Sequence, residues 1–184
     1  MLHQGIVIKK VDNGEYNQLV SLYTKDFGKI TAVAKSIKKP SSRQAGHLDT
    51  FNLVDFLLVL GKNYPIITSA QSVETFAGIK SSLSKSAVAT FVLEAFNNLV
   101  YDHEKDPALW GFLNSLLNRL NEGILDSSEA SGFLIGIQKE LIGLLGYSQE
   151  LKNEELKRLL DSLSPRKFLS PELISQFSYM TYLS

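Results

Sequence analysis

Apolar and polar residues alternate with a period of two in the first part of the chain, which predicts β-strands. The clearest case lies at residues 28–35, where Ile30, Ala32 and Ala34 alternate with Thr31, Val33 and Lys35. Similar segments that are rich in β-branched residues and bounded by turn residues predict further strands. The five predicted strands are residues 5–11, 16–24, 28–35, 51–60 and 66–76.

Turn signals separate these strands. Asn13-Gly14 is the strongest hairpin signal in the chain, because both residue types tolerate positive φ. Pro40 cannot donate to a sheet and ends the third strand region. Five strands with short turns and one longer insert, residues 41–48, fit a small closed barrel such as the OB-fold, in which this insert is often helical. We therefore expect about one helical turn there. An SH3-like barrel has the same periodicity and stays an alternative.

The period changes to that of amphipathic helices near Gly78. Asp106-Pro107 is a typical helix start, with an N-cap residue followed by proline at the first helical position. The predicted helices are residues 81–101, 107–121 and 127–145, with a last one from Ser170 to the end; residues 152–160 form a short charged segment of the same helical half. The expected fold class is α+β, with an N-terminal five-stranded OB-fold β-barrel at residues 1–79 and an α-helical bundle domain at residues 80–184.

The net charge of zero conceals an asymmetry. Residues 1–85 carry eleven basic and six acidic side chains, a net charge of +5, and the remaining residues carry −5. A basic half joined to an acidic half favours an anionic partner for the first half. The chain has no cysteine, which excludes disulfides and thiolate metal sites. We expect a cytoplasmic protein, since no signal peptide and no apolar run of about 18 residues is present.

The sequence contains no motif for covalent catalysis or for a cofactor. Its histidines, His3, His47 and His103, have no ligand spacing, and we expect the Asp102-His103-Glu104 segment to be a solvated loop. Phosphate-binding loops and nucleophile elbows are absent. We expect a binding protein without enzymatic activity, metal or cofactor.

A cationic loop follows the third predicted strand. Lys38, Lys39 and Arg43 lie there among small hydroxyl residues, which suits a phosphate backbone. Aromatic residues are interleaved with the basic ones, as in proteins that stack the bases of single strands on aromatic rings. Tyr16, beside a turn, and Phe27, at a turn tip, are the aromatic candidates, although either ring could instead pack against the barrel edge.

Residues 5–9, 14–20 and 22–43 resemble the RecO family of bacterial recombination mediators, and residues 140–147 resemble its Leu-Gly-Tyr helix. The resemblance implies an OB-fold that binds single- and double-stranded DNA, followed by a helical domain. RecO proteins anneal strands and, with RecR, load the recombinase onto DNA coated with single-strand-binding protein; they are not enzymes. The DNA-binding residues expected on this basis, with the aromatic candidates added, are Lys9, Lys29, Lys35, Lys38, Lys39, Arg43, Tyr16 and Phe27.

The sequence also departs from the family pattern. Many relatives have a four-cysteine zinc finger after the Leu-Gly-Tyr helix, and none can form here. Relatives often have an arginine near the start of that helix that helps to hold the acidic tail of single-strand-binding protein; Lys139 is the candidate substitute. Two other functions stay open: an OB-fold RNA-binding protein and a non-catalytic adaptor that binds only proteins.

Overall fold

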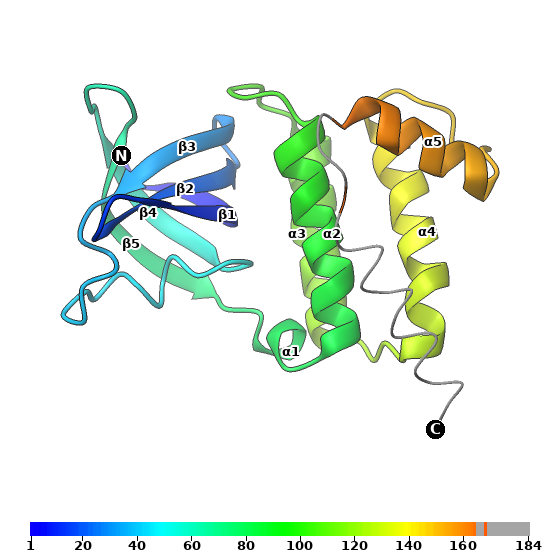
Figure 1. Ribbon diagram of the computed structural model, residues 1–184, viewed down its shortest axis with the longest axis horizontal. Helices are drawn as coiled ribbons and strands as arrows, with labels where there is room; N and C mark the ends of the chain where they lie inside the picture. Colours follow the sequence, from blue (N-terminus) through cyan, green and yellow to red (C-terminus); the bar gives the residue numbers. More distant parts are fainter. Residues whose placement is uncertain (165–167, 169–184) are drawn as a thin grey trace. The chain divides into compact units, whose positions relative to one another are not determined.

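The computed structural model describes residues 1–164 and Phe168 (Figure 1). It divides into two compact units, one of Met1–Phe76 with Val100–Trp110 and one of Ala77–Leu99 with the described residues from Gly111 onward. The last predicted helix, from Ser170, lies outside the described residues. The predicted domain limits, 1–79 and 80–184, stay a prediction.

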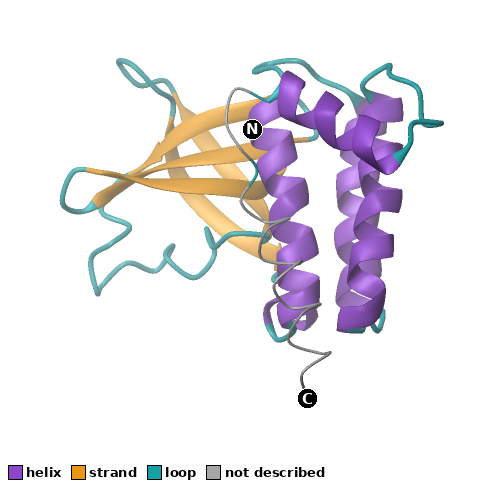
Figure 2. Cartoon of the chain, turned by 45° about the vertical axis from the view of Figure 1, so that its right-hand side comes forward, coloured by secondary structure: helices purple, strands orange, loops and turns teal. Residues whose placement is uncertain are grey.

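Five strands form a closed barrel in the first unit (Figure 2). They are β1 (His3–Asn13), β2 (Asn17–Thr24), β3 (Gly28–Ala34), β4 (Leu53–Val59) and β5 (Ile66–Glu74). Their order around the barrel is β1-β2-β3-β5-β4; the β3–β5 pair is parallel and the other pairs are antiparallel. This Greek-key order is that of the OB-fold, so the expected fold class is confirmed.

The β1–β2 hairpin forms where Asn-Gly predicts it. Gly14 has φ +79°, and Asn13 pairs with Asn17 across a three-residue loop. The insert between β3 and β4 contains a single α-turn, with Leu48 N donating to Gln44 O at 3.0 Å, and no helix. Its ends are fixed because Ile37 and Leu48 are buried in the barrel core.

The barrel core consists of the inward side chains of all five strands together with these two loop residues. The alternation predicted for β3 is confirmed, since Ile30, Ala32 and Ala34 are buried and the residues between them are partly exposed. The remaining core residues are Val7, Val20, Leu22, Val54, Phe56, Ile67 and Ala70.

The second unit is helical, as predicted. Its helices are α1 (Ala77–Lys80), α2 (Leu83–Leu99), α3 (Pro107–Glu122, whose first turn belongs to the barrel unit), α4 (Ser127–Leu144) and α5 (Asn153–Leu163). Phe96 of α2 and Phe112 of α3 stack with ring centroids 6.2 Å apart. The α4 end expected at Gly146-Tyr147 is present, with Gly146 at φ +89° and Tyr147 N bonded to Ile142 O. None of the helices in the described part is long and apolar enough to cross a membrane.

The segment between α2 and α3 belongs to the barrel unit, and Asp102, His103 and Glu104 are exposed there in a loop, as expected; its backbone also pairs with β3. β5 pairs only with Val33 and Ala34 of β3, which leaves the first half of this strand edge open. Asp102 forms a parallel bridge with Lys29 at that edge, and His103 N donates to Lys29 O at 2.9 Å. The segment thus covers strand groups that would otherwise be unpaired.

Candidate nucleic-acid interface

The register of the strands orders the outward side chains into rows, because cross-strand partners share a face of a sheet. One row is polar and joins Lys9, Ser21 and Thr31, whose two hydroxyl oxygens lie 3.0 Å apart. The next row, called the apolar row below, takes one residue from every strand: Val11, Leu19, Val33, Ile66 and Val59.

The apolar row is open to solvent at both of its ends. Val11 is 47% exposed and Val59 is 48% exposed, and the three residues between them are partly exposed. Lys9 precedes Val11 by two residues and Lys35 follows Val33 by two, so cations lie on both sides of the row. The barrel therefore presents apolar surface flanked by positive charge.

The β1–β2 hairpin tip and the start of the β3–β4 loop lie side by side. Lys38 N donates to Tyr16 O at 3.1 Å, and Ser36 N donates to Asn17 Oδ1 at 2.8 Å. Lys39 Nζ lies over the Tyr16 ring, 5.2 Å from its centroid. The structure thus brings together three predicted site residues, Tyr16, Lys38 and Lys39, and Lys35 lies three residues before Lys38 in the chain.

Asp12 modifies the charge of this cluster. Its carboxylate lies 2.6 Å from Lys38 Nζ and also accepts a hydrogen bond from Gln18. The Lys38 contact, followed by that of Gln18, lowers the pKa of Asp12 below its ordinary value. Lys38 is therefore paired within the protein, whereas Lys9, Lys35 and Arg43 have no ion-pair partner among the described residues.

Two polar contacts hold the far end of the β3–β4 loop against β5, and two more tie the loop to Asn52. Gln44 Nε2 donates to Thr68 O at 3.1 Å, and Ser72 N donates to His47 Nδ1 at 3.2 Å. The buried Asn52 donates to the carbonyls of Gly46 and His47. The loop that carries Arg43 is therefore attached at both ends while its cationic side chains stay exposed.

The β4–β5 hairpin adds residues that were absent from the predicted site. Val33 N donates to Pro65 O at 2.8 Å, which fixes this hairpin beside β3 at the same end of the barrel. Its exposed tip carries Leu60, Lys62 and Tyr64, and Tyr64 is 45% exposed. An exposed Lys-x-Tyr pattern in a turn was the available signal, but its position beside β3 depends on the barrel closing.

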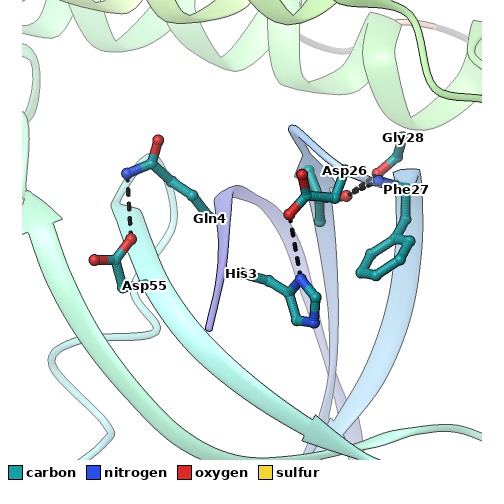
Figure 3. A network of polar contacts seen from close by, with 7 residues as sticks. His3, Gln4, Asp26, Phe27, Gly28 and Asp55 are labelled. Carbon is teal, nitrogen blue, oxygen red and sulfur yellow. Dashed lines mark hydrogen bonds and ion pairs between the residues drawn. The ribbon is translucent and has the colours of Figure 1, made fainter. Parts of the chain in front are cut away.

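Phe27 and Lys29, two residues of the predicted site, lie at the β2–β3 turn, which is at the other end of these strands from Tyr16. The eight-residue β2 separates Phe27 from Tyr16 by about 26 Å. Phe27 packs on His3, with ring centroids 4.7 Å apart, and His3 Nδ1 lies 3.2 Å from Asp26 Oδ2 (Figure 3). Lys29 Nζ lies 3.3 Å from Asp102 Oδ1. Neither residue joins the cluster at the hairpin tip.

The helical unit has a separate pocket of about 430 Å³ at the α3–α4 turn. Arg119 and Phe133 both line it, with the Arg119 guanidinium carbon 5.7 Å from the centre of the Phe133 ring. Ile124, 89% exposed, lines the pocket with Glu129. Lys139, the residue expected to bind a partner, is half-buried on α4 and does not line this pocket.

The strand order and the outward rows define the first unit as an OB-fold protein domain. The family model described as "Recombination protein O N terminal" matches residues 1–76, which contain all five strands. The chain is 31% identical over 149 residues to the "DNA repair protein RecO" of Dehalococcoides mccartyi (strain ATCC BAA-2266), covering 81% of this chain and 57% of that protein. It is 30% identical over 167 residues to the protein of the same name from strain ATCC BAA-2100, covering 88% and 64%. The chain belongs to the RecO family, and it spans about three fifths of the length of these relatives.

Proposed function

We propose that this protein acts in DNA repair and recombination as a RecO-type mediator whose barrel binds DNA. The observation that supports this most directly is the joining of Tyr16, Lys38 and Lys39 beside an apolar row flanked by Lys9 and Lys35. Cations that follow a backbone, combined with rings that stack on bases, are the usual means of holding a single strand without sequence preference.

Each part of this surface has a distinct role in the proposal. Lys9, Lys35, Lys39 and Arg43 contact phosphates, which sets the salt dependence of binding. Bases that are unstacked in a single strand lie on Tyr16 and on the apolar row, whereas a duplex reaches only the cations. Duplex binding is thus electrostatic, and single-strand binding has an additional apolar component.

The finer activities follow the relatives' name and the resemblance described above. Under this proposal the protein anneals complementary strands and, with RecR, loads a recombinase onto DNA coated with single-strand-binding protein. It acts in the cytoplasm on the nucleoid, and it works by binding rather than by covalent catalysis.

We place the acidic tail of single-strand-binding protein in the pocket of the helical unit. Arg119 supplies a positive charge beside Phe133 and the exposed Ile124, which suits a peptide with acidic and apolar residues. Lys139 is the competing candidate from the sequence. Binding of a synthetic acidic tail peptide to Arg119→Ala and to Lys139→Ala separates the two, because only the variant that lacks the true contact loses affinity.

The main experiment is a fluorescence-polarisation titration of single-stranded DNA across a salt series. Replacement of Lys35, Lys38, Lys39 and Arg43 by alanine should weaken binding and reduce the slope of log affinity against log salt by about 0.7 for each of the three proposed phosphate contacts that are lost, those of Lys35, Lys39 and Arg43. A control with the same charge change replaces four exposed cations elsewhere: Lys25, Lys105, Lys157 and Arg158.

The outcomes distinguish the functions. Equal loss in both quadruple variants would assign the effect to net charge rather than to this surface. No salt-sensitive DNA binding by the wild type would contradict the proposal and favour an adaptor that binds only proteins. Preference for RNA in direct competition with DNA would favour the RNA-binding alternative.

A further inference from the structure

The acidic segment Asp102–Asp106 lies at one end of the barrel face that is proposed to bind DNA. Its backbone pairs with the open edge of β3 at Lys29, and the Glu104 backbone lies directly against Gly28. Gly28 has φ +68° and no side chain, which allows this close approach. The segment is therefore built into the barrel unit rather than placed beside it.

Lys29 forms an ion pair with this segment. Its Nζ lies 3.3 Å from Asp102 Oδ1, and its side chain is only 12% exposed, whereas that of Asp102 is 64% exposed. A carboxylate oxygen thus occupies the position beside the ammonium group that a phosphate oxygen would need. The exposed Glu104 adds a second negative charge two residues further on.

Lys35 provides the contrast within the same strand region. Lys29 lies on the outward face of β3, and Lys35 follows the end of this strand, six residues after Lys29. Lys35 is exposed and has no ion-pair partner among the described residues, while Lys29 is paired and nearly covered. The two lysines are equivalent in the strand pattern but differ in their availability to a ligand.

We infer that Asp102 limits the DNA-binding surface: it neutralises Lys29, and the nucleic acid extends from the β1–β2 hairpin tip to the row of Lys9, Ser21 and Thr31 but not to Lys29. Asp102 is in this sense a positioning residue, because it determines where the bound strand ends on the barrel. The inference rests on the proposed DNA binding. Lys29, which the sequence suggested as a DNA contact, instead forms an ion pair with Asp102 inside the protein.

A double-mutant cycle with single-stranded oligothymidine tests this. In the full chain, Lys29→Gln should change affinity less than twofold and leave the salt slope unchanged, because Lys29 makes no phosphate contact that could be lost. Asp102→Asn should release Lys29 and steepen the slope by about 0.7, which is about a 2.6-fold larger loss of affinity between 50 and 200 mM salt. Lys29→Gln added to Asp102→Asn should abolish that gain.

Asp26→Asn is the matched control. It removes one exposed carboxylate from the same end of the barrel, where Asp26 faces His3 and not Lys29. Any effect of net charge on DNA binding appears equally in Asp26→Asn and Asp102→Asn. The inference requires that Asp102→Asn steepen the salt slope more than Asp26→Asn does, and equal changes in the two variants would overturn it.

A second measurement uses the wild type and depends on no variant. In backbone NMR spectra, oligothymidine should shift the amide signals of Lys9, Lys35 and Lys39 and leave those of Lys29 and Asp102 in place. Shifts at Lys29 and Asp102, or a Lys29→Gln variant that loses slope as Lys35→Gln does, would overturn the inference while leaving the proposed function intact. Absence of any salt-dependent binding by the wild type would instead overturn the proposed function, and this inference with it.

Discussion

Lys39 Nζ lies 5.2 Å from the centroid of the Tyr16 ring, which joins a cation of the β3–β4 loop to an exposed aromatic side chain of the β1–β2 hairpin. The backbone bond from Lys38 N to Tyr16 O fixes the same two segments to each other. A ring that is 42% exposed and has a cation over one face can still accept a base on its free surface. The hairpin tip and the loop should therefore act as one binding element.

Tyr16→Ala should weaken single-stranded DNA binding by about 1–3 kcal/mol, the usual contribution of one base stacked on an aromatic ring. Tyr16→Phe should retain most of the affinity, because the ring and its stacking surface remain. Tyr101→Ala is the control, since Tyr101 is 75% exposed and lies outside the proposed surface. Fluorescence-polarisation titrations at one salt concentration measure all three. Wild-type affinity in Tyr16→Ala would show that the ring only supports the loop.

Substitutions in the apolar row should affect DNA binding differently from substitutions of the lysines. Replacing Val11, Val33 and Val59 by threonine keeps the β-branched shape that suits a strand but reduces the apolar surface. Single-strand affinity should fall while the salt slope stays the same, because apolar contacts release no counterions. Duplex affinity should not change. Val73→Thr, a substitution of a valine that is 53% exposed on β5 outside the row, is the control. A changed slope would contradict the assignment.

The sequence predicted the local features of this surface and missed those that depend on long-range pairing. The alternation of β3 and the Asn13-Gly14 hairpin were predictable because each is encoded within a few neighbouring residues. Lys29 and Lys35 look equivalent in the sequence. They differ in the structure because Asp102, 73 positions after Lys29, pairs with the edge of β3. No pattern of neighbouring residues predicts a contact between positions so far apart in the chain. The β4–β5 hairpin residue Tyr64 was missed for the same reason.

Gly28→Ala should destabilise the barrel unit more than Gly14→Ala. Both glycines have positive φ, +68° and +79°, so each substitution introduces about 1–2 kcal/mol of backbone strain. A Cβ on Gly28 would also collide with the Glu104 backbone, whereas a Cβ on Gly14 meets no atom within 4 Å. This collision should add about 1–3 kcal/mol. Denaturant unfolding of both variants measures the difference in the free energy of unfolding. Equal losses would show that residues 102–104 can move away from the new Cβ without loss of stability.

Ionisation of the Tyr23 phenol should reduce the stability of the protein at alkaline pH. Burial, and secondarily the charge of Asp106, raises the pKa of Tyr23 from 10.0 to about 12. A raised pKa favours the neutral phenol in the folded state, so this contribution to stability is complete below pH 10 and is lost as the pH rises toward 12. Unfolding measurements in this pH range should show a steeper fall for the wild type than for Tyr23→Phe. Identical pH profiles would mean that Tyr23 ionises in the folded state as a free tyrosine does.

Asp106 connects the start of α3 to Tyr23, and two substitutions separate its roles. Its carboxylate accepts hydrogen bonds from Ala108 N at 2.7 Å and Leu109 N at 3.1 Å, and its backbone carbonyl accepts one from the Tyr23 hydroxyl at 3.4 Å. Asp106→Ala removes the cap and should cost about 1 kcal/mol of unfolding free energy.

Asp106→Asn should keep nearly all of that stability, because an asparagine side chain caps a helix about as well as an aspartate. Both substitutions remove the negative charge and should therefore lower the pKa of Tyr23, which spectroscopic titration of the phenol follows. The backbone carbonyl is present in both variants, so any change in this pKa reports the carboxylate alone. A stability loss in Asp106→Asn as large as in Asp106→Ala would show that the charge of Asp106, and not its hydrogen bonds to the helix, stabilises the start of α3.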